Sequence, residues 1–255
     1  LDTKKVRRIT DGSTWYSTDG EFSYAWSPDG KWFTLEFIGN RHDPYSDIGL
    51  VSAQGNSPIV NLTNSGYMSG SPRFALDGNA ILFKTERYGM RAHASWGSQD
   101  DAMLIFLNQD AYDKYCLSKE DYELRKELEA EQKKTQDKDT AKDKKRSKKD
   151  TEQEKTGNDK SQVKDIVVEL KNIEDRIVRL TPNSSDMGSV IISKDGESLY
   201  YFAAFEDGYD LWKMDLRKKD TRLLHKMDAG WASMEMDKDG KNLFLLGGKT
   251  MQKMD

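Results

Sequence analysis

The sequence predicts an all-β protein built from repeated units, because an Asp-Gly pair recurs in the same setting along the chain. Each pair stands between one run of apolar and aromatic residues and a second such run. Asp-Gly suits a two-residue hairpin, since both central residues of a type I′ turn need positive φ, which glycine adopts without strain. The segments that contain such a pair are residues 25–37, 73–86, 190–205 and 234–248.

The spacing of these pairs indicates the size of the repeat. The pairs begin at Asp29, Asp77, Asp195 and Asp239, at intervals of 48, 118 and 44 residues. A second element, a short run that ends in threonine, recurs at Thr10, Thr63 and Thr181, at intervals of 53 and 118 residues. Both elements are displaced by 118 residues at the same place, so a repeat of about 46 residues carries an insertion of about 72. Such a period with several strands is typical of one blade of a β-propeller.

Each repeat divides into four antiparallel strands. The Asp-Gly hairpin joins two strands rich in β-forming residues, such as residues 33–37 and 199–202. Residues 47–52 and 209–215 are predicted third strands, and the threonine-ending element is the outer strand. Continuous apolar stretches such as residues 199–205 fit strands that neighbouring blades bury on both faces. The predicted fold class is therefore an all-β propeller, with an irregular all-β sandwich as the alternative.

The two ends of the chain extend the repeat. Residues 4–10 are predicted to form an outer strand, and residues 250–255 a third strand. The result is about four blade equivalents over residues 1–255, which we interpret as an arc of a larger ring. In the alternative, the two end pieces complement one another in a fourth blade.

A charged insertion occupies residues 116–162, within the second full blade. It contains 14 Lys and Arg and 13 Asp and Glu, and Ala141 is the only aliphatic residue from 132 to 162. So few apolar side chains cannot offset the entropy of ordering the chain, which predicts disorder in the second half of the insertion. Acidic residues flank the lysine-rich run at 142–149, so we interpret that run as solvated rather than as a nucleic-acid site.

The first half of the insertion has helical features. Ser118 can cap a helix, and Tyr122, Leu124 and Leu128 form a modest apolar stripe along it. We therefore expect a helix near residues 118–131 that gives way to disorder.

The composition excludes several classes of protein. The formal charge of −4 and the pI near 5.6 argue against a dedicated nucleic-acid binder. A single cysteine, Cys116, excludes an intramolecular disulfide. No run of apolar residues is long enough to cross a membrane, so no membrane span is expected.

Patterns that carry catalytic or metal chemistry are sparse. His42, His93 and His225 lie far apart, and none has the H-x-x-x-H spacing of a metal site. Residues 237–240 begin like a calcium loop, but no further ligands follow, and a turn is the preferred interpretation. The sequence contains no G-x-S-x-G elbow, no phosphate loop and no H-E-x-x-H. We therefore assign no catalytic, cofactor-binding or metal-binding residue to this chain, and no cofactor.

Two stretches resemble the N-terminal propeller of tricorn-type serine peptidases. They are GMRAHASWGSQDDAMLIFLNQDAYDKY (residues 89–115) and, after the charged insertion, VVELKNIEDRIVRLT (residues 167–181). The resemblance covers essentially the whole chain. It implies two propellers ahead of a PDZ-like module and a serine-peptidase core, with the catalytic Ser and His in that core and none in this chain. Asp100, Asp101 and Arg176 match family-like motifs, and we expect them to make hairpin and blade-to-blade hydrogen bonds.

The resemblance also implies a function. Propellers of this family are thought to filter and channel unfolded peptides, so we expect a non-catalytic domain that guides or gates peptide substrates to a peptidase core outside this chain. The expected partners are peptides or unfolded proteins, the protein's own PDZ-like and peptidase domains, and a second copy of the chain. The expected localisation is periplasmic or in the cell envelope, with the cytoplasm as the alternative.

Two other functions stay open, because TolB and prolyl-oligopeptidase propellers share the S-x-D-G hairpins. The chain could be a stand-alone TolB-like propeller that binds proteins. It could also be the propeller of a prolyl-oligopeptidase-like hydrolase, whose G-x-S-x-G domain would lie downstream. The insertion and residues 89–115 favour the tricorn-like interpretation over both.

Overall fold

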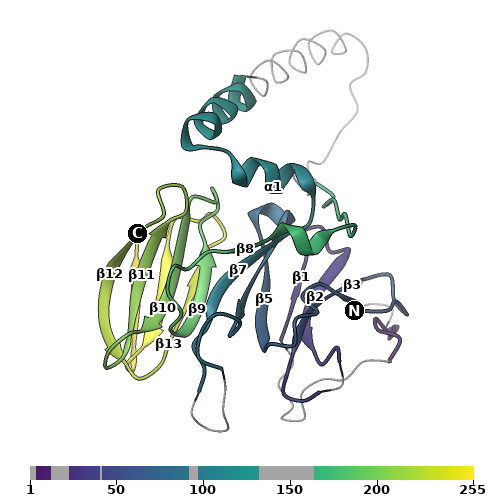
Figure 1. Ribbon diagram of the computed structural model, residues 1–255, viewed down its shortest axis with the longest axis horizontal. Coiled ribbons are helices and arrows are strands. Elements are labelled where there is room, and N and C mark those ends of the chain that lie inside the picture. The colour runs from purple at the N-terminus through teal and green to yellow at the C-terminus, as the bar shows by residue number, and fades with distance from the viewer. Residues whose placement is uncertain (1–3, 13–22, 41, 92–96, 132–163) are drawn as a thin grey trace, which may run out of the picture. The chain divides into compact units, whose positions relative to one another are not determined.

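The computed structural model describes all residues except 1–3, 13–22, 41, 92–96 and 132–163. The described strands form four antiparallel sheets, and each sheet is a meander in which the strands pair in their sequence order (Figure 1). Four such sheets are the blades of a β-propeller, so the predicted all-β propeller is confirmed.

The four sheets follow one another along the chain. The first contains β1 (Tyr24–Trp26), β2 (Trp32–Phe37), β3 (Asp47–Ser52) and β4 (Val60–Asn61). The second contains β5 (Ser69–Ala75), β6 (Ala80–Thr85), β7 (Asp101–Phe106) and β8 (Ile177–Arg179). The third contains β9 (Asp186–Ile192), β10 (Ser198–Ala204), β11 (Tyr209–Asp215) and β12 (Asp220–Ala229). The fourth contains β13 (Ala232–Met236), β14 (Leu243–Gly247) and β15 (Thr250–Met254).

The Asp-Gly turns lie at the predicted positions, but three of the four have a different geometry. In the first, the Ser27 amide donates to the Trp32 carbonyl at 2.9 Å and the Gly30 amide donates to the Ser27 carbonyl at 3.0 Å. This is a four-residue loop around a tight turn, not a two-residue loop. In three of the four turns the glycine has positive φ and the aspartate does not, so the type I′ prediction is wrong for these three. These glycines are Gly30 (69°), Gly196 (73°) and Gly240 (72°). In the turn of the second sheet both Asp77 (54°) and Gly78 (87°) have positive φ, as type I′ requires, and the Asn79 amide donates to the Leu76 carbonyl at 3.0 Å.

Side chains explain why a longer turn is favoured. Asp29 Oδ1 accepts from the Ser27 hydroxyl at 2.5 Å and from the Lys31 amide at 3.0 Å. The Ser27 oxygen also accepts from the Trp32 amide at 2.9 Å. A serine two residues before the aspartate therefore satisfies the loop's own backbone groups. The turn of the third sheet repeats these bonds with Ser193, Asp195, Glu197 and Ser198.

The threonine-ending element is held to the third strand by a buried aspartate. In the first sheet, Asp47 Oδ1 accepts from the Thr63 hydroxyl at 2.8 Å, and Thr63 Oγ1 accepts from the Ile48 amide at 3.0 Å. In the second sheet, Asp101 accepts from Thr181 at 2.8 Å. The hydroxyl of the recurring threonine thus accepts a hydrogen bond from a backbone amide and donates one to a carboxylate at the start of the third strand.

The core lies between neighbouring sheets. One cluster joins the first two sheets through Ile48, Leu50, Phe83 and Ile105, among others, and these four side chains are at most 2% exposed. A second cluster joins the last two sheets through Phe202, Leu211, Met234 and Leu245. All six residues of β7 are buried, as expected for a strand covered on both faces.

The N-terminal segment does not form the predicted outer strand. Residues 4–9 have no regular secondary structure, and Thr10 makes a single parallel bridge to Ser57 of the first sheet. Ile9 packs against the apolar cluster of that sheet, and the Arg7 guanidinium donates to the Ala53 carbonyl at 2.6 Å. Partial burial of Ile9 on the first sheet holds this segment there. Residues 250–254 do form the predicted third strand, as β15.

A helix that was not predicted from the sequence leads into the charged insertion. This is α1 (Gln109–Cys116), and residues 119–131, within the insertion, are also helical. Residues 113–164 form a unit of their own, in which Lys114 Nζ lies 2.7 Å from Glu129 Oε2 and the Ser118 hydroxyl accepts from the Asp121 amide at 3.1 Å. The predicted disorder falls on residues 132–162, which lie outside the described residues.

Candidate functional site

The first strands of the sheets converge and create the candidate site. β1 contacts β5, and β9 contacts β13, so the first strands of neighbouring sheets pack together. Arg73 on β5 also lies 3.6 Å from Glu235 on β13, although the second and fourth sheets are not neighbours in sequence. First strands that meet in this way surround the central opening of a propeller.

The backbone of β1 borders this opening. Among the described strands it pairs with β2 alone. Ser27 donates its amide to β2 and Ser23 accepts an amide from β2, both at 2.9 Å. Because alternate residues of an antiparallel pair direct their backbone groups to the partner, those of Trp26 point away from β2. The Trp26 amide and carbonyl are therefore placed to pair with an added strand.

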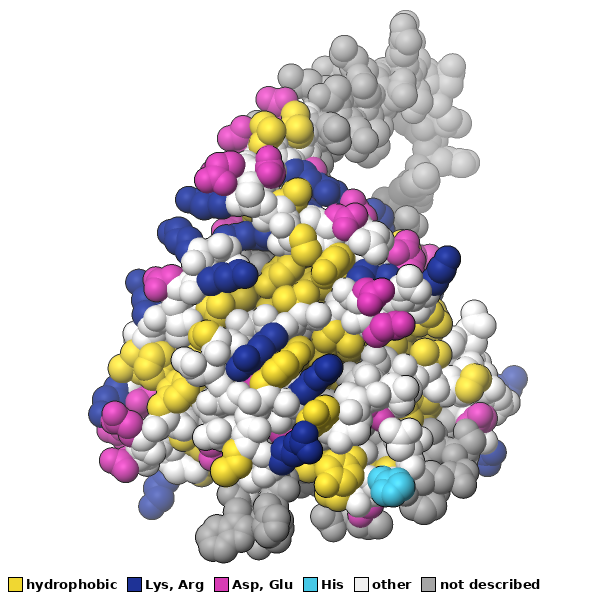
Figure 2. All heavy atoms as spheres, viewed as in Figure 1, with side chains coloured by type: hydrophobic (Ala, Val, Ile, Leu, Met, Phe, Trp, Pro, Cys, Tyr) yellow, Lys and Arg dark blue, Asp and Glu magenta, His cyan; other side chains and the backbone are white. Residues whose placement is uncertain are grey.

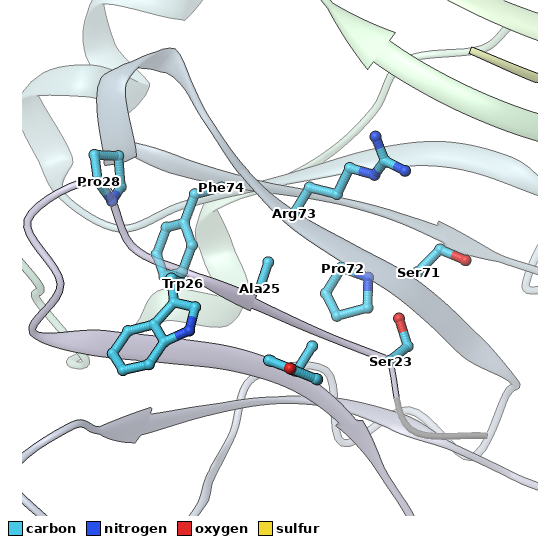
Figure 3. A pocket seen from close by; sticks show the side chains of 9 residues that line it. Ser23, Ala25, Trp26, Pro28, Ser71, Pro72, Arg73 and Phe74 are labelled. Atoms are coloured by element: carbon cyan, nitrogen blue, oxygen red, sulfur yellow. The ribbon is translucent and has the colours of Figure 1, made fainter. Parts of the chain in front are cut away.

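A groove of about 500 Å³ lies between β1 and β5 (Figure 3). Pro28, Trp26 and Phe74 lie at one end, and the hydroxyl groups of Ser23 and Ser71 lie at the other. Tyr24, Ala25, Pro72 and Arg73 complete the lining. Proline has no backbone amide and is tolerated on edge strands, so Pro72 fits this position on β5.

Two aromatic side chains of the groove are exposed yet held in place. Trp26 is 55% exposed and Tyr24 is 54% exposed. Their ring centroids lie 3.7 Å and 6.3 Å from that of Phe33, which is buried in the core of the first sheet. An exposed aromatic ring that rests on a buried one keeps its orientation and still offers apolar area to a ligand.

The groove can therefore take an extended polypeptide. The edge of β1 supplies hydrogen-bond donors and acceptors that are independent of the ligand's sequence. Trp26 and Phe74 supply apolar contacts for alternate side chains of such a strand. Arg73, at the rim, is engaged with Glu235 and adds a polar boundary.

The residues that match family-like motifs lie away from this groove. Asp101 is fully buried, and its carboxylate accepts from Arg179 at 2.9 Å, from Thr181 at 2.8 Å and from Ser184 at 2.7 Å. These bonds join the start of β7 to the end of β8 and the segment that follows it. Asp101 is thus a structural residue of the second sheet.

Asp100 lies where the second and third sheets meet. Its amide donates to the Ser185 carbonyl at 2.7 Å, and its carboxylate is 3.9 Å from Lys84 Nζ. Burial raises the pKa of the Asp100 carboxyl above its ordinary value, although the Lys84 charge opposes that shift. Nearby, burial raises the pKa of the Tyr209 hydroxyl, and its 2.6 Å hydrogen bond to Asp186 adds to the shift.

Arg176 is also structural. It is 3% exposed and lies in the short 3-10 turn η3 (Ile173–Arg176) that precedes β8. Its guanidinium donates to backbone carbonyls on both sides of the insertion. The acceptors are Phe106, Glu169, Lys171 and Asn172.

The histidines are not brought together. His42 lies 3.2 Å from the Asn40 carbonyl, and His225 lies 2.7 Å from the Gln252 side chain. His93 lies outside the described residues. Within the described part of the chain, no group of three or more histidine, cysteine and acidic side chains is placed to hold a metal ion. None of the helices in that part is both long enough and apolar enough to cross a membrane.

The sequence analysis missed the groove itself. Trp26 and Tyr24 stand in a predicted strand, where aromatic residues usually indicate core. One feature of the sequence does indicate an exposed position for Trp26. This residue directly precedes the Ser-Pro-Asp-Gly turn and so belongs to a first strand, and first strands border the central opening of a propeller. Phe74 and Arg73 come from the next first strand, and only the assembled sheets bring them beside β1.

Comparison with known proteins supports the fold. No protein-family model matches the chain, and no curated protein matches it. Among solved structures, the chain is similar to tricorn protease, with a TM-score of 0.52 and 10% identity over 91% of this chain and 22% of that one. It is also similar to a puromycin-hydrolyzing peptidase of Mycobacterium tuberculosis, with a TM-score of 0.51 and 11% identity over 91% of this chain and 29% of that one.

A putative TolB from Agrobacterium tumefaciens is a more distant neighbour, with a TM-score of 0.48 and 12% identity over 88% of this chain and 53% of that one. The chain spans less than two thirds of the length of each of these three proteins. The similarity to tricorn protease and to the puromycin-hydrolyzing peptidase, at such low identity, shows a shared fold, and that fold is the β-propeller.

Proposed function

We propose that this chain is a non-catalytic propeller module of a tricorn-like serine peptidase, and that it guides peptide substrates to a peptidase core outside these residues. The observation that carries the proposal is the groove between β1 and β5, where the Trp26 backbone faces away from β2 beside two exposed aromatic rings. A module that guides unfolded peptides needs contacts that tolerate many sequences, and backbone pairing with β1 supplies them. The periplasmic or cell-envelope location and the PDZ-like and peptidase partners belong to this proposal.

Peptide binding in the groove can be measured directly. A short fluorescent apolar peptide without secondary structure should bind the chain, and its anisotropy should rise on titration. Trp26→Ala should weaken binding about tenfold, because a buried aromatic contact commonly contributes 1–2 kcal/mol or more. Methylation of alternate backbone nitrogens in the peptide should weaken binding to a similar degree, because it removes the donors that pair with β1.

Trp231 provides a matched control. It is 54% exposed, close to the 55% of Trp26, and it lies between β12 and β13, outside the groove. Trp231→Ala should leave peptide affinity unchanged. Equal losses from the two substitutions, or full binding of the methylated peptide, would refute strand addition at β1.

The peptidase part of the proposal needs a separate experiment. The chain alone should not react with a serine-directed fluorophosphonate probe, and stoichiometric labelling would contradict a non-catalytic module. Sequencing the gene downstream of Asp255 separates the alternatives. A PDZ-like module and a Ser/His core there would support the tricorn-like assignment. A stop codon shortly after one more blade would favour a stand-alone TolB-like propeller, and a G-x-S-x-G domain a prolyl-oligopeptidase-like enzyme.

A further inference from the structure

A stack of alternating arginine and tyrosine side chains lies at the ends of the second sheet's strands, opposite its Asp-Gly turn. The Arg91 guanidinium lies 4.5 Å from the Tyr67 ring centroid, and Arg87 lies 5.9 Å from Tyr67 and 5.6 Å from Tyr88. The Arg179 guanidinium lies 4.7 Å from the centroid of the Tyr88 ring, so Tyr88 stands between Arg87 and Arg179. We call this set, Arg91–Tyr67–Arg87–Tyr88–Arg179, the arginine–tyrosine ladder.

One end of the ladder is fixed to the core. Arg179 donates from Nε at 3.0 Å and from a terminal nitrogen at 2.9 Å to the fully buried carboxylate of Asp101. Tyr88 is 48% exposed and covers Arg179, so its ring is positioned by an immobilised guanidinium. Each further member stacks on the one before, which reduces the rotamer freedom of Arg87 and Arg91 before any ligand arrives.

The two exposed arginines of the ladder, Arg87 and Arg91, keep their hydrogen-bonding capacity. Arg87 and Arg91 are exposed, and neither takes part in an ion pair within the described part of the chain. Stacking uses the face of a guanidinium, whereas its N–H groups lie in the plane, so a stacked arginine can still bind an oxyanion in a bidentate manner. Two such groups share the Tyr67 ring, and so their distance apart is set by the protein.

Figure 2 shows one face of the molecule, on which Lys and Arg side chains lie among hydrophobic ones. The chain as a whole is acidic, with a formal charge of −4. Two neighbouring arginines, Arg87 and Arg91, that form no ion pair among the described residues of an acidic protein are a discrete site for carboxylates rather than a broad basic surface of the kind that binds nucleic acid.

We propose that the arginine–tyrosine ladder binds acidic segments of polypeptide, with Arg87 and Arg91 each taking one carboxylate. The tyrosine rings beside them contact the aliphatic part of the same segment. The ladder is a second site, separate from the groove between β1 and β5, and does not depend on the function proposed for that groove.

Binding of a labelled peptide of alternating glutamate and serine tests this inference, with the glutamine–serine peptide as the reference ligand. The unmodified chain should bind the glutamate peptide at least about tenfold more tightly, because charge-assisted bonds contribute 1.5–3 kcal/mol each. Arg87→Gln with Arg91→Gln should abolish that preference. Arg87→Lys with Arg91→Lys should weaken binding of the glutamate peptide about threefold or more, since lysine keeps the charge but not the planar guanidinium.

Two controls separate the ladder from general electrostatics. Lys226→Gln with Lys241→Gln removes the same charge from exposed positions in the third and fourth sheets and should change affinity less than about twofold. Trp26→Ala should leave glutamate-peptide binding unchanged, so failure of one site does not imply failure of the other. The inference is overturned if the lysine pair matters as much as the arginine pair, if the Lys variants bind like the unmodified chain, or if a single-stranded oligonucleotide binds more tightly than the glutamate peptide.

Discussion

The second and third sheets have the same strand order, but their third and fourth strands are joined in opposite ways. In the third sheet, the four residues 216–219 connect β11 to β12. In the second sheet, the seventy residues 107–176 connect β7 to β8. Both outer strands nevertheless pair antiparallel with the third strand. The pairing is more regular in the second sheet, where β7 and β8 keep one register, whereas β11 and β12 shift register twice.

The difference shows that the connection between the third and fourth strands of a blade can be long, provided that both of its ends are held in place. Leu107 donates to the Asn79 carbonyl at 2.8 Å and accepts from the Glu169 amide at 2.7 Å, so the two ends of the insertion meet beside the end of β7. Arg176 then joins the returning chain to Phe106. Because the entropy of closing a loop grows only with the logarithm of its length, these contacts can hold a long insertion.

The largest effect is expected at the buried aspartates that hold the outer strands. Asp101→Ala leaves Arg179, Thr181 and Ser184 without their shared acceptor and should cost about 3 kcal/mol of unfolding free energy. The corresponding Asp210 of the third sheet accepts two backbone amides and no arginine, so Asp210→Ala should cost about 1 kcal/mol. Urea unfolding of both variants measures the contrast. Equal losses of unfolding free energy in the two variants would show that Asp101 is no more important for stability in the sheet with the long connection than Asp210 is in the sheet with the short one.

Arg176 gives the next largest effect. Arg176→Met keeps approximately the volume of the side chain but removes the Arg176 donor from four backbone carbonyls, of which Asn172 keeps the Asp175 amide, and it should destabilise the chain by about 2 kcal/mol. Arg222→Met, on the exposed side of β12, should change stability by less than about 0.5 kcal/mol. If both variants unfold at the same urea concentration, the insertion is not held by Arg176.

A smaller and pH-dependent effect is expected in the short connection. Asp215 Oδ1 accepts from the Lys218 and Arg217 amides, which close the four-residue turn. The Lys218 amide holds the pKa of the Asp215 carboxyl below its ordinary value, against an opposing contribution from burial. Asp215→Ala should therefore cost about 0.5–1 kcal/mol at neutral pH.

The sign of the pH effect follows from that lowered pKa. A carboxyl with a lower pKa in the folded state stabilises the fold above its unfolded pKa, and this contribution is lost as pH falls through the folded value. The difference between Asp215→Ala and the unmodified chain should thus shrink in acid. A difference that grows as pH falls toward 3 would contradict this origin.

The smallest effect is expected from shortening the long connection. Replacing residues 132–162 by a brief Gly-Ser linker leaves the contacts of Leu107, Glu169 and Arg176 in place. The melting temperature should stay nearly unchanged, and a drop of more than about 5 °C would show that the removed residues stabilise the propeller. Circular dichroism on heating measures it.

Most of the fold could be predicted from the sequence because its signals are local. A hairpin needs only the residues on either side of one turn, and the four Asp-Gly positions located the strands β1–β2, β5–β6, β9–β10 and β13–β14 correctly. The turn type was wrong for the first turn because the Ser27 and Asp29 side chains, not the Asp-Gly pair alone, decide the loop length. The outer strand predicted for residues 4–10 was wrong because Ile9, which is partly buried, packs against the first sheet, and this is a tertiary contact.

The candidate sites could be predicted far less well. The groove combines Trp26 with Phe74, and the ladder combines Tyr67 with Arg87, Arg91 and Arg179. None of these combinations has a characteristic spacing, because each depends on which strands come to lie side by side. Exposure of Trp26 is equally non-local, since a strand tryptophan is more often buried.

The unequal connections also set the order in which the sheets can close while the protein is being made. A ribosome adds about 5–20 residues per second, so β12 follows β11 out of the tunnel within about a second. For β8 the wait after β7 is about 4–14 s, because seventy residues intervene. Throughout that interval β7, whose six residues are all buried in the finished fold, has one edge without its partner. The second sheet is therefore the place where a nascent chain is most exposed to mispairing, and where a chaperone would have the longest time to act.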